Sequence, residues 1–429
     1  MKKFLAMLLA LVMALSLVAC GEKDQPDNNG GSDDNQQAAT VMVGFITLHD
    51  ENSTYDKNFI DAAKAACATL GLVENENYFI KTNVGETEQC AEVAADLVDA
   101  GCNIIFADSF GHEPYMIEVA KENPDVQFCH STGTRAHTEG LANYHNAFAS
   151  IYEGRYLAGI AAGLKLNAMI EAGDIKAEEA KMGYVGAFTY AEVVSGYTSF
   201  FLGARSVCPT VTMDVTFTGS WYDETLEKEG AEKLIQGGCK LISQHADSLG
   251  APTACENAGV PNVSYNGSTK DACPNTFIVS SRIDWAPYYE MCIKAVMDGT
   301  EIPADWTGTL ATNSVVLTDL NTAVAAEGTA EAIATATEKL EKGELHVFDC
   351  STFTTKVDDK VNTFKADYLK LDEAGHITSY MADVDTDQAY TGDTEVVHDG
   401  YFSESEFRSA PYFDLQIDGI NLLDTNFGG

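Results

Sequence analysis

Basic residues are scarce in this chain: 26 Lys and Arg stand against 65 Asp and Glu, which gives a formal net charge of −39. Such an excess of negative charge repels phosphate backbones, so the composition argues against a nucleic-acid partner. Beyond the first twenty residues there is also no second apolar run of the ~20 residues that a membrane-spanning helix needs. We interpret the acidity as promoting the solubility of the folded part.

Motifs of common catalytic sites are missing as well. The patterns G-x-S-x-G, the P-loop, and G-x-G-x-x-G after a strand do not occur. The many acidic residues form numerous accidental pairs, and nothing in the sequence selects one of them as a glycosidase site. We therefore predict no catalytic residue, no enzyme activity and no bound cofactor.

The cysteine and histidine spacing excludes the usual metal and redox motifs. No two of the 11 cysteines lie within three residues of each other, so there is neither a C-x-x-C pair nor a zinc knuckle. His112 precedes Glu113, but no second histidine follows at the spacing of H-E-x-x-H. We expect no metal site and mostly buried thiols, with Cys255 and Cys273 as the first pair to inspect for a disulfide.

The first forty residues predict an export signal, a lipid-anchored cysteine and a flexible linker. Lys2 and Lys3 precede an apolar run from Phe4 to Val18, and the run ends in Leu-Val-Ala-Cys at Cys20. This pattern is typical of a lipoprotein signal peptide over residues 1–19, with Cys20 as the acylated first residue of the mature chain. Residues 20–40 are almost wholly polar and predict a flexible linker. We therefore expect the protein on the outer face of a cell membrane, with its folded part starting near residue 41.

The folded part contains a degenerate internal repeat. Residues 94–102 lead into 103–111, and residues 231–239 lead into 240–250; each copy predicts an amphipathic helix, a glycine stop, a buried strand and an Ala-Asp-Ser tip. The first strand and helix of each half of the chain also correspond. A strand over 42–47 and a helix near 58–70 correspond to a strand over 181–188 and a helix near 193–206.

Strands that alternate with helices predict parallel sheets with right-handed connections, hence an α/β fold of two Rossmann-like lobes. We expect chain segments near 143–151, 278–285 and 346–351 to cross between the lobes as a hinge. The predicted divisions are 41–148 with about 283–345 for the N-terminal lobe, 149–282 with about 346–355 for the C-terminal lobe, and 356–429 as an extension packed on the lobes.

In parallel sheets a ligand sits beyond the carboxyl ends of the strands, so the residues just after each strand are the candidate contacts. These are Tyr55, Asp56, Asp108, Trp221, His245, Asp247, Ser248, Asn266 and Trp285. Either tryptophan could stack on a planar ring or pack in the core. Asp108 and Asp247 occupy matching tips of the repeat, and either could bind ligand or cap a helix. Asp247 is the stronger ligand candidate because His245 and Ser248 flank it.

Several stretches resemble one known family. The lipobox, the tether and the segment 143–163, with its E-G-R-Y-L-A-G core, look like the basic membrane lipoprotein family of ABC-transporter solute-binding proteins. Further similar stretches are residues 123–128, 181–186, 219–223 and 346–349. The resemblance implies a type I periplasmic-binding-protein fold, ABC permease partners, and a purine nucleoside or nucleobase held between the lobes of a monomer.

The resemblance also assigns roles at the site, with departures. Tyr55 would stack on the base. Asp56 stands where the family has an asparagine, and because a carboxylate only accepts hydrogen bonds, it would favour a different edge of the base. The family's ribose-binding G-x-D-x-D tip is represented by Ser264–Ser268, and its S-x-x-K by a segment that includes Arg282. A free nucleobase, or a nucleoside held differently, therefore fits as well as the family ligand.

Two other classes of function remain open. A sensor could bind the same ligand and pass the signal to a partner, in which case permease and ATPase genes would be absent from its neighbourhood. A cleft enzyme such as a nucleoside hydrolase would release free base from purine nucleosides.

Overall fold

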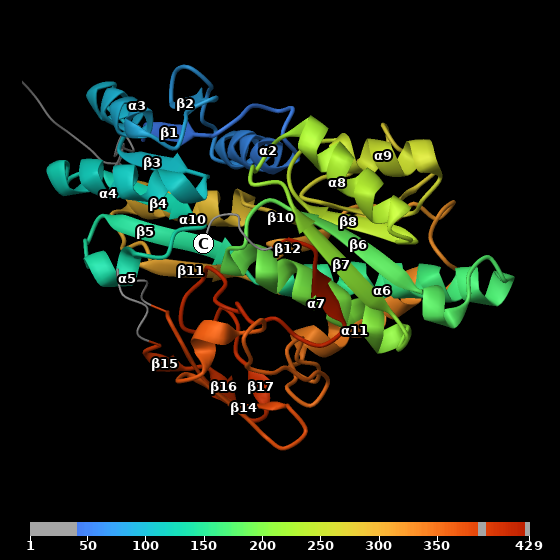
Figure 1. Cartoon of the computed structure of the whole chain (residues 1–429). Helices are drawn as coiled ribbons and strands as arrows, with labels where there is room; N and C mark the ends of the chain where they lie inside the picture. Colours follow the sequence, from blue (N-terminus) through green and yellow to red (C-terminus); the bar gives the residue numbers. More distant parts are fainter. Residues whose placement is uncertain (1–40, 385–391, 425–429) are drawn as a thin grey trace, which may run out of the picture. The chain divides into compact units, whose positions relative to one another are not determined.

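The computed structural model describes residues 41–384 and 392–424, which Figure 1 shows coloured along the chain. The predicted signal peptide, Cys20 and the linker over 20–40 lie outside these residues. Within the described part, no helix combines the length and the apolar composition that crossing a bilayer requires.

The N-terminal lobe is built on a six-stranded sheet in the order β11-β5-β4-β3-β1-β2, and all its strands are parallel. The strands are β1 (Val43–Ile46), β2 (Tyr78–Lys81), β3 (Ile104–Ala107), β4 (Gln127–Ser131), β5 (Tyr144–Ala149) and β11 (Asp305–Gly308). The helices are α2 (Thr54–Thr69), α3 (Glu88–Asp99), α4 (Glu113–Glu122), α5 (Ala136–Glu139) and α10 (Ala286–Asp298). Helices α2 and α10 pack together and α3 packs with α4, so two separate hydrophobic clusters flank the sheet.

The C-terminal lobe has a seven-stranded sheet in the order β12-β10-β9-β8-β6-β7-β18, in which only the β10–β12 pairing is antiparallel. The strands are β6 (Lys181–Gly186), β7 (Thr212–Phe217), β8 (Leu241–His245), β9 (Asn262–Tyr265), β10 (Phe277–Ile283), β12 (Val315–Leu317) and β18 (Ile420–Leu422). The helices are α6 (Ile151–Ala172), α7 (Ala191–Val207), α8 (Glu224–Gln236), α9 (Gly250–Ala258) and α11 (Thr329–Glu341). The predicted pair of α/β lobes with parallel sheets is therefore confirmed.

The internal repeat appears as matching turns after α3 and α8. Gly101 and Gly238 both have φ = +93°, a conformation that glycine adopts without steric cost. In each copy the following cysteine N–H, of Cys102 or Cys239, donates to the carbonyl of a helix leucine at 3.0 Å. This bond satisfies a carbonyl at the helix end and turns the chain into the next strand.

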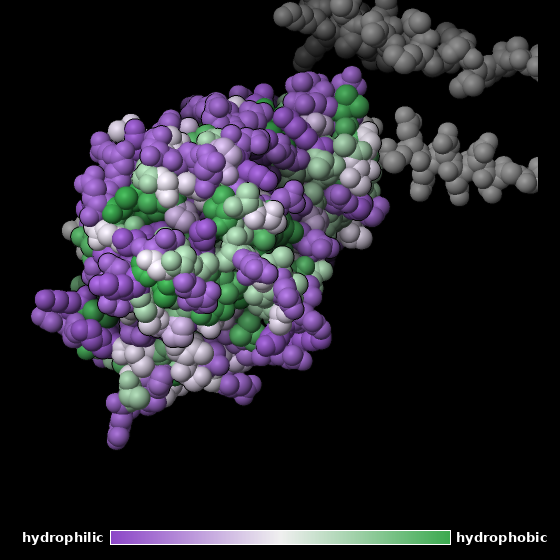
Figure 2. Space-filling model, turned by 90° about the vertical axis from the view of Figure 1, so that its right-hand side faces the viewer, coloured by the Kyte–Doolittle hydropathy of each residue, from purple (hydrophilic) through white to green (hydrophobic). Residues whose placement is uncertain are grey.

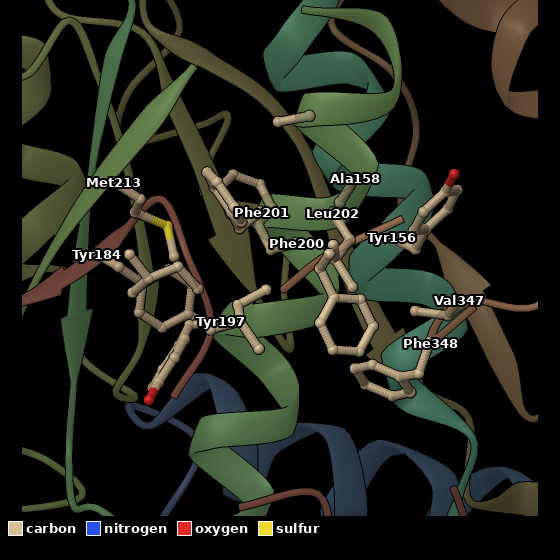
Figure 3. Close-up of a cluster of buried hydrophobic side chains, with 14 of the residues drawn as sticks. Tyr156, Ala158, Tyr184, Tyr197, Phe200, Phe201, Leu202, Met213, Val347 and Phe348 are labelled. Atoms are coloured by element: carbon tan, nitrogen blue, oxygen red, sulfur yellow. The ribbon is translucent and has the colours of Figure 1, made fainter. Parts of the chain in front are cut away.

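The E-G-R-Y-L-A-G segment lies in α6, where small residues allow a close approach to α7. A Cβ on Gly159 would come within 2.1 Å of the Phe200 carbonyl oxygen, and one on Gly203 within 2.0 Å of the Tyr156 carbonyl oxygen. The side chains around this contact form the core of the lobe, part of which Figure 3 shows. Gly159 of the motif and Gly203 of α7 therefore set the spacing of two buried helices.

The chain crosses between the lobes after Ala149, after Ile283, and between Gly308 and Val315. The first two crossings lie within the predicted segments. The third predicted crossing, 346–351, is wrong, because Phe348 and Cys350 are buried in the C-terminal lobe and form backbone hydrogen bonds with the extension. Residues 315–345 also belong to the C-terminal lobe rather than the N-terminal one, since β12 pairs with β10 and α11 packs on α6.

The C-terminal extension contains short strands and completes the C-terminal lobe. They are β13 (Leu369–Leu371), β14 (Ile377–Ala382), β15 (Thr394–Glu395), β16 (Val397–His398) and β17 (Tyr401–Phe402), while β18 pairs with β7. The extension also reaches the N-terminal lobe, where the Ser409 N–H donates to Asp305 Oδ2 at 2.8 Å.

The cysteines of the described residues are buried free thiols. The ten cysteines from Cys67 to Cys350 are all free and buried, so Cys255 and Cys273 are not bridged. Burial also raises the pKa of Cys67 and Cys239 to about 12, which keeps these thiols protonated and unreactive. Figure 2 shows hydrophilic residues surrounding smaller hydrophobic areas on one face of the molecule.

Candidate ligand-binding site

A narrow cavity lies where the strand ends of both lobes meet. Its lining comes from the carboxyl ends of β8 and β9 and from the segments that follow β1, β3, β4, β6, β7 and β8, as the strand-end rule predicts. The lining residues are Leu48, His49, Tyr55, Asp56, Ser109, Phe110 and Thr132 from the N-terminal lobe, with Glu192, Trp221, His245, Asp247 and Tyr265 from the C-terminal lobe. The cavity has a volume of about 10 Å³, close to the space that one buried water needs.

Contacts between the lobes close this cavity. The backbone N–H of Thr54 donates to the Asp247 carbonyl oxygen at 3.0 Å, and the Thr54 hydroxyl donates to the same oxygen at 3.1 Å. The Phe110 and Tyr190 rings are 4.9 Å apart between centroids. These contacts therefore join the two lobes beside the cavity.

Asp56 lines the cavity, but other groups occupy its carboxylate. Oδ1 accepts the His49 N–H at 2.7 Å, and Oδ2 accepts the hydroxyl of Ser53, the N-cap of α2, at 2.6 Å. Burial by itself would raise the pKa of Asp56, but the hydrogen bonds from His49 and Ser53 outweigh it and leave the pKa lowered. Asp56 is therefore a charged residue that fixes both the start of α2 and the loop before it.

Tyr55 presents a half-buried ring to the cavity from the first turn of α2. Its hydroxyl donates to the Asp108 carbonyl oxygen at 2.6 Å, and its ring lies 4.8 Å from Phe59. These two contacts hold the ring in one orientation, so it is available as a preformed stacking surface.

Asp108 does not line the cavity. Its Oδ1 accepts the Leu48 N–H at 3.2 Å, while Oδ2 is buried without a hydrogen-bond partner. Burial, and next the negative charge of Asp56, raise the pKa of Asp108 well above the ordinary range. The residue connects the ends of β1 and β3 from beneath the cavity.

Asp247 lines the cavity from the other lobe and is only 4% exposed. Burial raises its pKa well above the usual range, and the charges of Asp56, Glu227 and Glu192 add to the effect. Its backbone N–H donates to the Trp221 carbonyl at 3.0 Å, which ties the two predicted contacts together.

His245 and Trp221 complete the predicted residues at the cavity. His245 lies between Glu192, 3.4 Å from Nε2, and the Tyr184 hydroxyl, 3.4 Å from Nδ1. Burial lowers the pKa of His245, so the imidazole is neutral at pH 7. Trp221 is half-buried, with its ring 5.0 Å from Phe188.

The remaining predicted residues lie elsewhere. Ser248 is fully buried: its N–H donates to Glu227, and its hydroxyl accepts the Gly250 N–H at 3.0 Å and so supports the start of α9. Asn266 lines a separate groove beside Arg282 and α2. Trp285 is 1% exposed and stacks on Phe59 at 4.5 Å, because α10 packs on α2 and turns the indole into the core. Ser248 and Trp285 therefore do not line the cavity.

Sequence reasoning missed several lining residues. Thr132 directly follows β4, His49 lies three residues after β1, Tyr265 is the last residue of β9, and Glu192 lies in the first turn of α7. Applying the strand-end rule to every strand would have found the first three. Within the described residues, no group of three or more His, Cys, Asp or Glu side chains is arranged to hold a metal ion.

Comparison with known proteins agrees with this architecture. A purine-binding protein from Brucella abortus is 33% identical over 61% of this chain and 70% of its own length. A putative ABC transporter glucose-binding protein from Haloferax volcanii is also 33% identical, over 60% of this chain and 62% of its own. An ABC transporter solute-binding protein from Conexibacter woesei has a similar fold, with a TM-score of 0.58 at 20% identity, over 71% of this chain and 98% of that one.

The family model described as Bmp, "ABC transporter substrate-binding protein PnrA-like", matches residues 44–347, which include both sheets apart from β18 and every residue that lines the cavity. Substrate-binding proteins of this kind bind small molecules for ABC permeases. The chain belongs to the Bmp family of ABC transporter substrate-binding proteins.

Proposed function

We propose that this protein captures a purine nucleoside, a nucleobase or a similar flat heterocycle between its lobes and delivers it to an ABC permease. The observation that carries the proposal is the set of rings around the narrow cavity: Tyr55 and Phe110 from one lobe, Trp221 and Tyr265 from the other. Rings on opposing lobes suit a flat aromatic ligand, and the carboxylates and histidines between them supply directional hydrogen bonds.

Capture would proceed by hinge closure. The cavity has room for about one water molecule, so the lobes would have to open for a purine to enter. The three crossing segments would absorb the rotation while each lobe stays rigid. A ligand that contacts both lobes favours the closed form by its higher affinity for that form. The permease would then bind the closed lobes.

We further propose that acylated Cys20 anchors a monomer to the outer face of the membrane through the polar linker over 20–40. Replacing Cys20 by alanine should abolish metabolic labelling with palmitate and release the protein from the cell. Labelling that survives the substitution would refute the anchor and leave the ligand site unaffected.

The relatives favour two ligand classes. One is named as purine-binding and the other as a putative glucose-binding protein, at equal identity. Aromatic rings and carboxylates also bind sugars, so glucose is the second candidate. We favour the heterocycle because rings face the cavity from both lobes.

The test is mass spectrometry of small molecules released from the purified protein, followed by calorimetry with nucleobases, nucleosides and glucose. We expect Tyr55→Ala and Trp221→Ala each to weaken heterocycle binding by about tenfold, the value of one lost stacking contact. Trp285→Phe is the matched control: it should lower stability and leave affinity unchanged. Binding of glucose alone, or unchanged affinity in both cavity variants, would contradict the proposal.

A further inference from the structure

Acidic side chains gather around the cavity. Asp56, Glu192 and Asp247 line it, and Asp108 lies behind Tyr55. No Lys or Arg side chain belongs to the cavity lining in the described part of the chain. A buried charge is costly unless an opposite charge compensates it.

The cations near the cavity compensate this charge only in part. Arg135 and Arg408 line an adjoining groove that also includes Glu192, but neither forms an ion pair with it in the described residues. His49 lies 3.3 Å from Asp56 and can balance that carboxylate when protonated. Arg155 is fully buried behind the Tyr265 ring, 5.2 Å from its centroid, and donates to Ser243 Oγ and other uncharged oxygens rather than to a carboxylate.

Asp247 and Glu192 are thus left without a cationic partner. Among the described residues neither forms an ion pair with Lys or Arg, and the histidine beside Glu192 is neutral. The raised pKa of Asp247, caused first by burial and then by the surrounding carboxylates, reports the same shortage of positive charge.

A second, independent feature of the cavity indicates an unfilled polar position. Thr132 lines the cavity, is 3% exposed, and its Oγ1 has no hydrogen-bond partner. Its φ of +72° is strained for a β-branched residue. Strain of this kind persists where the surrounding structure needs the side chain in place, and the hydroxyl is positioned for a ligand group.

From these observations we infer that the ligand carries a positive charge on or beside its flat ring, as an N-alkylated or protonated heterocycle does. The inference rests on the proposed function and narrows it. The aromatic faces attract such a cation through their quadrupoles, and the unpaired carboxylates attract it by direct charge. Phosphorylated ligands such as nucleotides would be repelled by the same carboxylates.

Two pairs of isomers test charge separately from shape. 1-Methyladenosine is a ring cation and N6-methyladenosine is neutral; 7-methylguanosine is a ring cation and N2-methylguanosine is neutral. Calorimetry at mildly acidic pH keeps both cations charged. We expect at least one cation to bind about tenfold or more tightly than its neutral isomer, in line with the strength of a desolvated cation–π contact.

Glu192→Gln should reduce this preference severalfold, because it removes one cavity carboxylate and keeps its shape. Glu229→Gln is the control, since it removes an equal charge from an exposed position on α8. A preference that both variants retain would overturn the electrostatic explanation.

These measurements distinguish failure of the charge inference from failure of the proposed function. If nucleosides bind but neither cation exceeds its isomer, the charge inference is wrong and the proposed function stands. If glucose binds and no nucleoside or nucleobase does, both are wrong.

Discussion

The helix-glycine-strand unit of the N-terminal lobe can be compared with its copy in the C-terminal lobe. Ile105 lies beside Gly44 on β1, and Ile242 lies beside Gly183 on β6, so the two strands have the same register. Asp108 stands three residues after Ile105, whereas Asp247 stands five residues after Ile242. The second tip is longer, and the two aspartates are therefore not at equivalent positions.

The difference in loop length gives the two aspartates different positions relative to the cavity. Asp108 stays beneath the cavity and holds the Leu48 N–H, while the longer loop carries Asp247 to the cavity and to Thr54. The helix pairs differ as well. Phe59 and Trp285 stack between α2 and α10, while glycines bring α6 and α7 into contact. A repeated backbone can thus support unlike sites, because side chains and loop lengths change more freely than strand register.

The largest effect should come from the glycine contact that only the C-terminal lobe has. Gly159→Ala would force a methyl group into the Phe200 carbonyl and should lower the free energy of unfolding by about 3 kcal/mol. Gly230→Ala on α8 is the matched control, since its Cβ would meet its nearest neighbour at an ordinary 3.4 Å. The control should stabilise by about 0.5–1 kcal/mol through helix propensity. Thermal and urea unfolding measure both; equal stabilities would refute the packing explanation.

The next effect concerns Glu227, which occupies the α8 position that Cys90 holds in α3. Burial raises the pKa of Glu227 from 4.5 to about 7. The folded state therefore binds the proton more tightly: its stabilising contribution is complete below the unfolded pKa and is lost as the pH rises through about 7. At about 1.4 kcal/mol per pH unit, the loss amounts to roughly 3 kcal/mol.

Glu227→Gln should remove this loss, so its stability relative to the wild type should increase from pH 4.5 to pH 8. Denaturant unfolding at several pH values measures it, with Glu229→Gln as the control for a general loss of charge. A difference between Glu227→Gln and the wild type that does not vary with pH would contradict the pKa shift.

Substituting each aspartate in turn tests directly whether the longer loop brings only Asp247 to the ligand. Asp247→Asn should weaken ligand binding by about tenfold, because a cavity carboxylate is lost. Asp108→Asn should leave affinity within about threefold and alter mainly stability, since the residue holds backbone beneath the site. Calorimetry with the identified ligand decides between them. Equal losses of affinity would mean that both aspartates contact ligand.

The smallest effect should come from the contact between the lobes. Thr54 is the first residue of α2, where proline is well tolerated, and Ser53 before it is extended. Thr54→Pro removes both donors to the Asp247 carbonyl and should weaken binding about fivefold by disfavouring closure. Thr54→Val keeps the N–H and should show part of the effect. Small-angle scattering should detect a more open apo form; an unchanged profile and affinity would argue against a role in closure.

Much of the fold could be predicted because it depends on local pattern. The repeat, the glycine stops at Gly101 and Gly238, and the alternation of helices with strands all follow from residues that are near neighbours in sequence. The third crossing was misplaced because β11 and β12 are short, and pairing with distant β5 and β10 creates them.

The site was predicted less completely. Tyr55, Asp56, Trp221, His245 and Asp247 line the cavity because each lies at the carboxyl end of a strand or in the segment that follows it, and their contact with a ligand stays a prediction. Trp285 lies in the core, which the sequence could not show because a tryptophan at a helix start has the same local pattern whether it faces a cavity or a core. Only the packing of α10 on α2 decides which.

The sequence by itself determined the α/β class, the repeated unit and the edge of each sheet at which polar residues gather, since these depend on periodicity and on glycine conformation. The tertiary structure decided which polar side chains face the cavity, which carboxylates lack a cation, and where the chain crosses between lobes. Those outcomes depend on loop length and on contacts between residues far apart in the chain, such as Thr54 with Asp247, and local pattern carries no information about them.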